Sequence, residues 1–216
     1  MIHFHIITLF PEGIEPYLKS SIIGRAVAAK KIKISFYDPK KFTRDKYGRV
    51  DRRPYGGGPG MVLEPDGMLR AAEKAFRRAQ GEQVEKIFFA TDGKLFSEAE
   101  AKRLAKKKNI LFICGHYEGV DARVQKILKA KKVSVGPYVL TGGELPAATL
   151  IDAISRHVSG VLGKAESLEA SRVSSPEVYT RPDVLVWKGK KYKVPGVLKS
   201  GHHAKIEEWK KAKRSS

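Results

Sequence analysis

The chain has 216 residues, 42% of them hydrophobic, which is enough for one large domain or for one domain with a small appendage. Lys and Arg number 42 against 23 Asp and Glu, so the formal net charge is +19 and the isoelectric point is near 10.0. The sequence lacks a membrane-length apolar run and the basic N-terminal region of a signal peptide. A single cysteine, Cys114, excludes an intrachain disulfide, so we expect a protein of the reducing cytoplasm.

The positive charge is concentrated in two stretches. Residues 30–53 hold ten Lys or Arg against three acids, and residues 187–216 hold ten against two. Clusters of this kind neutralise the phosphates of nucleic acids. They can equally be solvated faces, so charge alone only favours an RNA or DNA partner.

Hydrophobic periodicity predicts strands that alternate with helices along residues 1–158. The strand patterns cover residues 2–8, 32–37, 86–90, 110–114 and 133–135. The helical patterns cover about 15–29, 65–79, 97–107, 119–129 and 144–158, and Ser97 with Glu100 forms a capping box. This alternation predicts an α/β fold with a mainly parallel sheet covered on both faces.

Three glycine-rich loops interrupt this pattern, at residues 56–60, 115–119 and 136–143. Glycine lets the main chain come close to a ligand, although a single such loop is more simply an ordinary corner between a strand and a helix. Strand ends near residues 91, 115 and 136 predict one crevice, because parallel α/β sheets bind ligands beyond the carboxyl ends of their strands. No dinucleotide or Walker A motif and no zinc spacing is present, so we expect no metal ligands.

Two further segments carry weaker signals. Residues 43–60 have little periodicity and four glycines in the last five positions, so they form either an ordered loop for a base or phosphate or a flexible linker. Residues 164–175 are polar and are interpreted as a linker to a small basic tail. The tail contains enough apolar residues for a small core around a helix at about 203–213, namely Trp187, Tyr192, Val194, Val197, Leu198, Ile206 and Trp209.

Four long motifs then indicate a family. Arg53–Met61, Cys114–Asp121, Tyr138–Ala147 and Tyr179–Pro182 closely resemble the bacterial tRNA (guanine(37)-N(1))-methyltransferases of the knotted SPOUT class. The resemblance runs in order along nearly the whole chain. It also includes Ile7–Pro11, Gly24–Ala26 and Ser200–Ala204.

The resemblance implies a knotted methyltransferase domain over 1–163, an interdomain linker over 164–175 and a small basic domain over 176–216, shorter than in relatives. It also implies a deep trefoil knot and a homodimer whose subunits together build each active site. S-adenosylmethionine would be the methyl donor, and Mg²⁺ is a further requirement of the family. The donor-binding residues carried over are Thr91, Gly115, Gly119, Val135, Gly136, Tyr138, Leu140, Gly142, Gly143 and Pro146.

The chemistry of guanine N1 sets its own demands. N1 carries a proton, so a methylase needs a general base there and a cation for the charge that grows on O6. In the family these are an arginine at a helix end, matched here by Arg156, and an aspartate in the following linker. Ala170 stands where the aspartate would align, so the adjacent Glu169 is the candidate base and Glu166 the alternative. Both glutamates can also be read as solvated linker acids.

The resemblance further implies contacts with tRNA by Arg25, Tyr55, Gly57, Gly58, Gly60, Arg181 and His202. Arg52 and Pro137 stand where the family commonly has acidic residues, which separates this chain from its relatives at those points. Two alternatives to this function are a knotted methylase with another RNA target and an RNA-binding protein that has lost catalysis.

Overall fold

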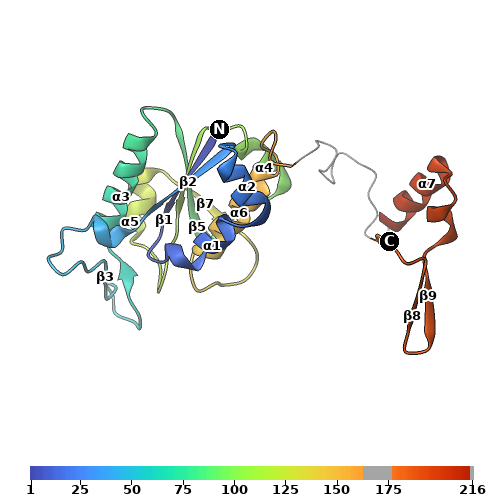
Figure 1. Cartoon of the computed structure of the whole chain (residues 1–216). Coiled ribbons are helices and arrows are strands. Elements are labelled where there is room, and N and C mark those ends of the chain that lie inside the picture. The colour runs from blue at the N-terminus through green and yellow to red at the C-terminus, as the bar shows by residue number, and fades with distance from the viewer. Residues whose placement is uncertain (163–176, 215–216) are drawn as a thin grey trace. The chain divides into compact units, whose positions relative to one another are not determined.

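The computed structural model describes residues 1–162 and 177–214. The chain divides into two compact units, Met1–Leu162 and Gly163–Ser216, which are described separately below (Figure 1). The linker predicted over 164–175 lies outside the described residues, as do Glu166, Glu169 and Ala170.

Unit 1 is built on a five-stranded parallel sheet with the order β2-β1-β6-β5-β7. Its strands are β1 (Ile2–Ile7), β2 (Ile32–Tyr37), β5 (Val84–Leu95), β6 (Asn109–Ile113) and β7 (Lys131–Ser134). Every residue of β1 and β6 is buried, as expected for central strands of a sheet that is covered on both faces. The two histidines of β1 are hydrogen-bonded to side chains of β2. The predicted α/β fold with a mainly parallel sheet is therefore confirmed.

Helices cover both faces of this sheet (Figure 1). One layer contains α1 (Glu15–Leu18), α2 (Ser21–Ala28), α4 (Glu98–Leu104) and α6 (Glu144–Ser155), and the other contains α3 (Pro65–Arg78) and α5 (Ala122–Leu128). Alternation along the strands divides the core accordingly. Phe4 and Phe112 pack into the cluster with α4 and α6, while Ile7 and Ile113 pack into the cluster with α3 and α5.

Two predicted element boundaries are wrong. The helix expected over 15–29 is two helices, because Ser21 at the start of α2 has a φ of +48° and breaks the run. Gly24 permits this break, since a Cβ there would overlap the backbone of Lys19. The strand expected to end at residue 90 continues to Leu95, because pairing with β7 shifts register and resumes after a bulge between Phe89 and Lys94.

The long segment 43–60 is tied down at its end by backbone pairing. A short antiparallel pair joins β3 (Asp51–Arg52) to β4 (Val62–Leu63). Leu63 N donates to Gly119 O at 2.9 Å, and Asp121 N donates back to Leu63 O at 3.0 Å. These bonds attach the end of one glycine-rich loop to another. Two short 3-10 helices, η1 (Pro11–Gly13) and η2 (Pro39–Lys41), complete the connections in unit 1.

Unit 2 contains a hairpin of β8 (Val184–Trp187) and β9 (Lys190–Lys193), the 3-10 helix η5 (Gly196–Lys199) and α7 (His203–Arg214). The small core predicted for the tail is correct only in part. Val194, Val197, Leu198, Ile206 and Trp209 are half-buried. Trp187 and Tyr192 are 62% and 54% exposed, because the hairpin carries them away from the helix.

Candidate functional site

A pocket of about 550 Å³ lies at the carboxyl ends of the strands in unit 1. Three segments line it: 88–92 from β5, 115–126 after β6, and 132–146 from β7 into α6. The three segments predicted to share one crevice therefore do so. Its volume falls within the range of about 300 to 1,000 Å³ that is typical of sites for small molecules and cofactors.

Close backbone contacts hold two of these segments together. Gly143 N donates to Gly115 O at 2.9 Å, and Gly142 forms an antiparallel bridge with His116. A Cβ on Gly143 would lie 2.6 Å from the Cα of Cys114, and one on Gly142 would overlap the Glu144 carboxylate. Any side chain at either position would push the two segments apart. Glycine is therefore needed at both positions for the two segments to form this wall of the pocket.

Glu144 connects this corner to the first strand. It lies in the first turn of α6, where an acid is favoured by the helix dipole, and its Oε1 accepts a hydrogen bond from Thr8 Oγ1 at 2.6 Å. Burial, and to a smaller extent the Glu144 charge, raises the pKa of the Cys114 thiol. A neutral, buried thiol is a poor nucleophile, which fits the packing role of this residue.

Charged side chains stand on the rim of the pocket. Lys132 Nζ lies 2.6 Å from Asp92 Oδ2, and the hydrogen bond from Lys132 lowers the pKa of that carboxyl. Lys126, Gln125 and Glu118 also line the pocket. These polar groups are not among the site residues predicted from the sequence. Glu118 nevertheless stands inside the Cys114–Asp121 motif, and Lys132 lies four residues before Gly136.

Glu118 also touches the glycine-rich loop at 56–60. A Cβ on Gly60 would lie 2.5 Å from the Glu118 carboxyl group, and Glu118 N donates to Met61 O at 2.9 Å. The end of that loop is therefore held at the rim of the pocket. Gly57 and Gly58 have φ values of +81° and +112° with open space around them, and Tyr55 is fully exposed at 101%.

The structure brings nine of the ten predicted donor-binding residues to the wall of this pocket. They are Thr91, Gly115, Gly119, Val135, Tyr138, Leu140, Gly142, Gly143 and Pro146. Gly136 is the exception, since it is not part of the pocket wall. It lies against the ring of Tyr138, which leaves no room for a side chain at position 136. The Tyr138 hydroxyl then donates to Val135 O at 3.2 Å, which fixes how the ring covers this corner.

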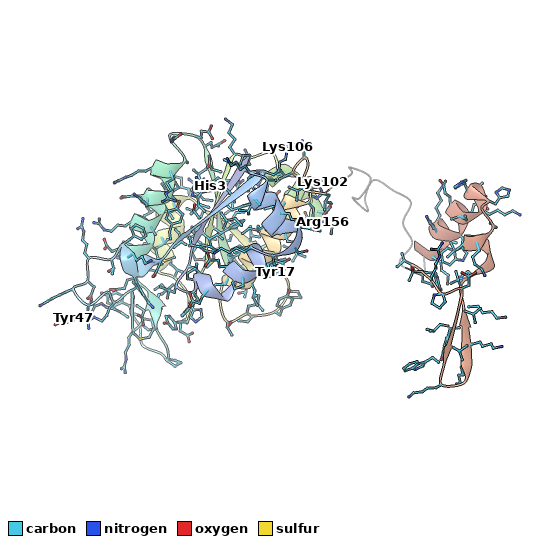
Figure 2. All side chains as sticks on the ribbon, in the orientation of Figure 1. His3, Tyr17, Tyr47, Lys102, Lys106 and Arg156 are labelled. Carbon is cyan, nitrogen blue, oxygen red and sulfur yellow. The ribbon has the colours of Figure 1, made fainter. Side chains whose placement is uncertain are left out.

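Arg156 does not join the pocket of its own chain. It is the C-cap of α6, whereas Pro146 lines the pocket from the first turn of the same helix. At about 1.5 Å per residue, the ten residues between them span roughly 15 Å. Arg156 lies beyond the helix end, on the side where Tyr17 of α1 contacts Asp152 of α6 (Figure 2).

The residues predicted to contact tRNA are divided between the two units. Arg25 is exposed on α2, and Tyr55, Gly57, Gly58 and Gly60 belong to the loop described above. Arg181 and His202 are exposed in unit 2. Arg52, which replaces an acidic residue of the family, lies 2.8 Å from Glu64 and 3.7 Å from Asp45.

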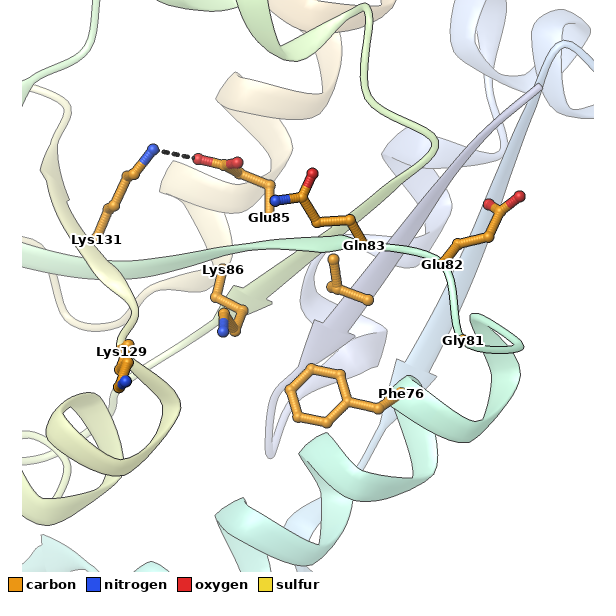
Figure 3. A pocket seen from close by; sticks show the side chains of 9 residues that line it. Phe76, Gly81, Glu82, Gln83, Glu85, Lys86, Lys129 and Lys131 are labelled. Atoms are coloured by element: carbon orange, nitrogen blue, oxygen red, sulfur yellow. Dashed lines mark hydrogen bonds and ion pairs between the residues drawn. The ribbon is translucent and has the colours of Figure 1, made fainter.

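A second pocket, of about 460 Å³, lies at the opposite, amino end of the strands (Figure 3). Phe76 from α3 approaches it from one side, and Lys86 and Lys129 line it together with the Lys131–Glu85 ion pair at 2.6 Å. Its lining contains none of the predicted site residues. Because parallel sheets bind ligands at the carboxyl edge, we take the first pocket as the candidate site.

Comparison with known proteins shows the family of the chain. The family model described as tRNA (Guanine-1)-methyltransferase TrmD matches residues 2–216. The chain belongs to this family. A protein of Caldanaerobacter subterraneus subsp. tengcongensis named tRNA (guanine-N(1)-)-methyltransferase is 41% identical, and the match covers 97% of this chain and 86% of that protein.

Two other relatives carry the same name. The protein of Lachnoclostridium phytofermentans is 38% identical over 97% of this chain and 85% of its own length. That of Pseudoalteromonas atlantica is 39% identical over 96% of this chain and 78% of its own length. The family resemblance predicted from the four sequence motifs is confirmed.

The part of the chain that the structure describes contains neither a candidate membrane span nor a candidate metal site. No helix there is both long enough and apolar enough to cross a bilayer. The same residues contain no cluster of three or more His, Cys, Asp or Glu side chains able to hold a metal ion.

Proposed function

We propose that this protein transfers the methyl group of S-adenosylmethionine to N1 of the guanine at position 37 of tRNA. The observation that carries the proposal is the pocket at the carboxyl edge, whose walls are held together by Gly142 and Gly143. Family membership supplies the reaction class.

The pocket fits a methyl donor that is bound largely by main chain. Its walls combine backbone at Gly115 and Gly119 with the apolar side chains of Val135, Leu140 and Pro146. Such a surface suits an adenine ring and an aliphatic chain, while polar rim groups can meet the charged amino-acid end. When bound, S-adenosylmethionine supplies a methyl group already activated by its sulfonium.

The protein must then prepare the guanine. We assign the stabilisation of charge on O6 to Arg156, whose planar guanidinium can donate hydrogen bonds to a carbonyl oxygen. We assign removal of the N1 proton to Glu169, with Glu166 as the alternative. Both glutamates lie outside the described residues, so this assignment rests on their nearness in sequence to Ala170, where the family aspartate would align.

Because Arg156 lies beyond the far end of α6 from its own pocket, we propose that it serves the pocket of a second subunit in a homodimer. The outward positions of α6, which repeat every three or four residues, are Leu145, Thr149, Asp152 and Arg156. Leu145 is 58% exposed, and Tyr17, which contacts Asp152, is 50% exposed. Two large exposed side chains, one on and one against an otherwise buried helix, support a subunit contact.

The resemblance also implies a knot and a set of contacts with tRNA. The chain path that joins Gly115 to Gly143 would be the trefoil knot. The residues Arg25, Tyr55, Gly57, Gly58, Gly60, Arg181 and His202 would contact tRNA. We also propose that the protein works in the cytoplasm, which the single reduced cysteine supports, and that dialysis against a chelator tests whether the family's Mg²⁺ requirement applies.

A methyl-transfer assay with radiolabelled donor and unfractionated tRNA tests the reaction. We expect the wild-type protein to label tRNA and Arg156→Ala to lose at least 100-fold in rate, as is typical when a charge-stabilising group is removed. Glu169→Gln should lower the rate while donor affinity persists. An unchanged rate in Glu169→Gln moves the base to Glu166, and full activity of Arg156→Ala contradicts the role of that arginine.

Two alternatives make different predictions in the same system. A non-catalytic RNA-binding protein would bind S-adenosylmethionine in calorimetry but transfer no labelled methyl group to RNA. A knotted methylase with another target would label RNA at a nucleotide other than guanine 37. The close-approach glycines around an intact pocket favour a protein that uses its donor.

A further inference from the structure

The β8–β9 hairpin of unit 2 exposes five large apolar side chains within ten residues. The exposed fractions are 40% for Val184, 50% for Leu185, 58% for Val186, 62% for Trp187 and 54% for Tyr192. A two-stranded hairpin without a packed layer is only marginally stable in water. Large exposed apolar side chains that gather on one face mark a site of interaction.

The strand register divides these side chains between two faces. Leu185 is opposite Tyr192 and Trp187 is opposite Lys190, and directly opposed side chains in an antiparallel pair point to the same face. Leu185, Trp187, Lys190 and Tyr192 therefore form one face, which we call the aromatic face. The other face consists of Val184, Val186, Lys191 and Lys193.

The charge of the hairpin restricts its partner. Residues 184–193 contain four lysines and no Asp or Glu. None of the ion pairs found among the described residues involves any of these lysines. A purely apolar protein surface on the aromatic face would desolvate Lys190 without compensation. A phosphate would satisfy Lys190, and the flat rings on the same face suit the faces of unpaired bases.

We propose that the aromatic face binds an unpaired segment of the RNA substrate. Trp187 and Tyr192 would stack on exposed bases. Lys190, which is opposite Trp187 on the same face, would contact the adjoining phosphate. The hairpin holds no reacting group, so its role is to anchor the RNA. This inference rests on the proposed function only in naming tRNA as the RNA.

Trp187 itself reports on this contact. The chain has two tryptophans, and Trp209 in α7 is half-buried, so Trp209→Phe leaves Trp187 as the sole emitter. We expect titration with an unmodified tRNA transcript to quench this emission, because bases stacked on an indole quench it. Saturable RNA binding without any change in Trp187 emission contradicts the proposal.

Affinity provides a second readout in the otherwise wild-type chain. Loss of one stacked base predicts that Trp187→Ala raises the Kd for tRNA about tenfold. Val186→Ala is the matched control, because Val186 is similarly exposed on the opposite face, and its Kd should stay within twofold. Lys190→Gln should reduce the slope of log K against log salt by about 0.7 to 0.9, as for one lost phosphate contact.

These measurements separate the hairpin from the methylation chemistry. If the wild type methylates tRNA, Trp187→Ala should raise KM and leave kcat and donor affinity unchanged. An unchanged KM and Kd in that variant overturns the hairpin proposal alone. Quenching of Trp187 by tRNA with no methyl transfer overturns the proposed function and supports the hairpin. Far-UV circular dichroism of each variant confirms that the protein is folded.

Discussion

The two units of this protein handle apolar side chains in opposite ways. In unit 1, two buried clusters fill both faces of the sheet, and the pocket is made where backbone segments meet at Cys114, Gly115 and Gly143. In unit 2, no described residue is buried below the surface, and the largest apolar side chains of the hairpin are exposed. The difference indicates that unit 1 is shaped for a small ligand enclosed by protein, and unit 2 for a partner that covers it.

The largest expected effect comes from a side chain at Gly143, in the closely packed corner of unit 1. Gly143→Val places its Cβ 2.6 Å from the Cα of Cys114, where backbone on both sides cannot yield. We expect loss of donor binding by calorimetry and a fall in the free energy of unfolding of about 3 kcal/mol or more. Gly13→Ala is the matched control, because a Cβ there meets nothing within 4 Å, and it should change neither quantity. Normal donor affinity in Gly143→Val would contradict the close packing of this corner.

Truncation of large apolar side chains distinguishes the two units directly. Leu150 in α6 is completely buried, so Leu150→Ala should lower the free energy of unfolding by about 2 to 5 kcal/mol. Trp187→Ala in unit 2 should change it by less than about 0.5 kcal/mol, because the side chain is 62% exposed. Chemical denaturation of both variants provides the values. A large loss from Trp187→Ala would show that the hairpin is packed within the protein.

A further effect concerns the acid sensitivity of unit 1. Burial, with the nearby His5 and the cations of Lys33 and Arg78, lowers the pKa of His3 to about 3, and His3 Nε2 is hydrogen-bonded to Ser35 Oγ at 2.9 Å. The unfolded chain then binds a proton near pH 6.5 that the folded chain does not. This group therefore contributes stability above pH 6.5, and the contribution is lost as pH falls towards 3.

Between pH 7 and pH 5 we expect His3 alone to remove roughly 2 kcal/mol of stability. His3→Gln keeps a polar side chain beside Ser35 and should flatten the dependence of unfolding on pH. His203→Gln, at an exposed histidine of unit 2, should leave it as in the wild type. Denaturant midpoints at the two pH values provide the measurement, and an unaltered slope in His3→Gln would contradict the assignment.

The smallest expected effect concerns the turn of the hairpin. Lys188 and Gly189 have φ values of +50° and +76°, a pair of left-handed residues for which Asn-Gly is the preferred sequence. Lys188→Asn should therefore stabilise the hairpin by a few tenths of a kcal/mol. Amide hydrogen exchange of Trp187 and Lys190 would detect slower opening. Faster exchange would contradict the turn geometry.

The sequence predicted the central sheet well, because apolar residues recur at strand spacing in β1 and β2 and at helical spacing in the helices between the strands. It also located the walls of the pocket, since Gly142 and Gly143 stand where two segments meet closely and Gly119 has a φ of +119°. It failed at Ser21 and at the bulge in β5, where tertiary contacts override the local pattern. The exposure of Trp187 was missed because apolar composition does not reveal which side chains lack a partner.

The position of Arg156 could not be predicted from the sequence either. The motif gives the residue, but only the length and direction of α6 show that it lies far from the pocket of its own chain. Polar rim residues such as Glu118 and Lys132 were overlooked for a similar reason. Their place beside the pocket depends on how three separate segments meet at the carboxyl edge.

The most direct test of the proposed reaction is to map the methylated nucleotide. A tRNA transcript with guanine at position 37 is incubated with the protein and S-adenosylmethionine, digested to nucleosides and oligonucleotides, and analysed by mass spectrometry. We predict 1-methylguanosine at position 37 and no product from a transcript with adenine there. Unmodified transcript, or methylation at another nucleotide, would contradict the proposal.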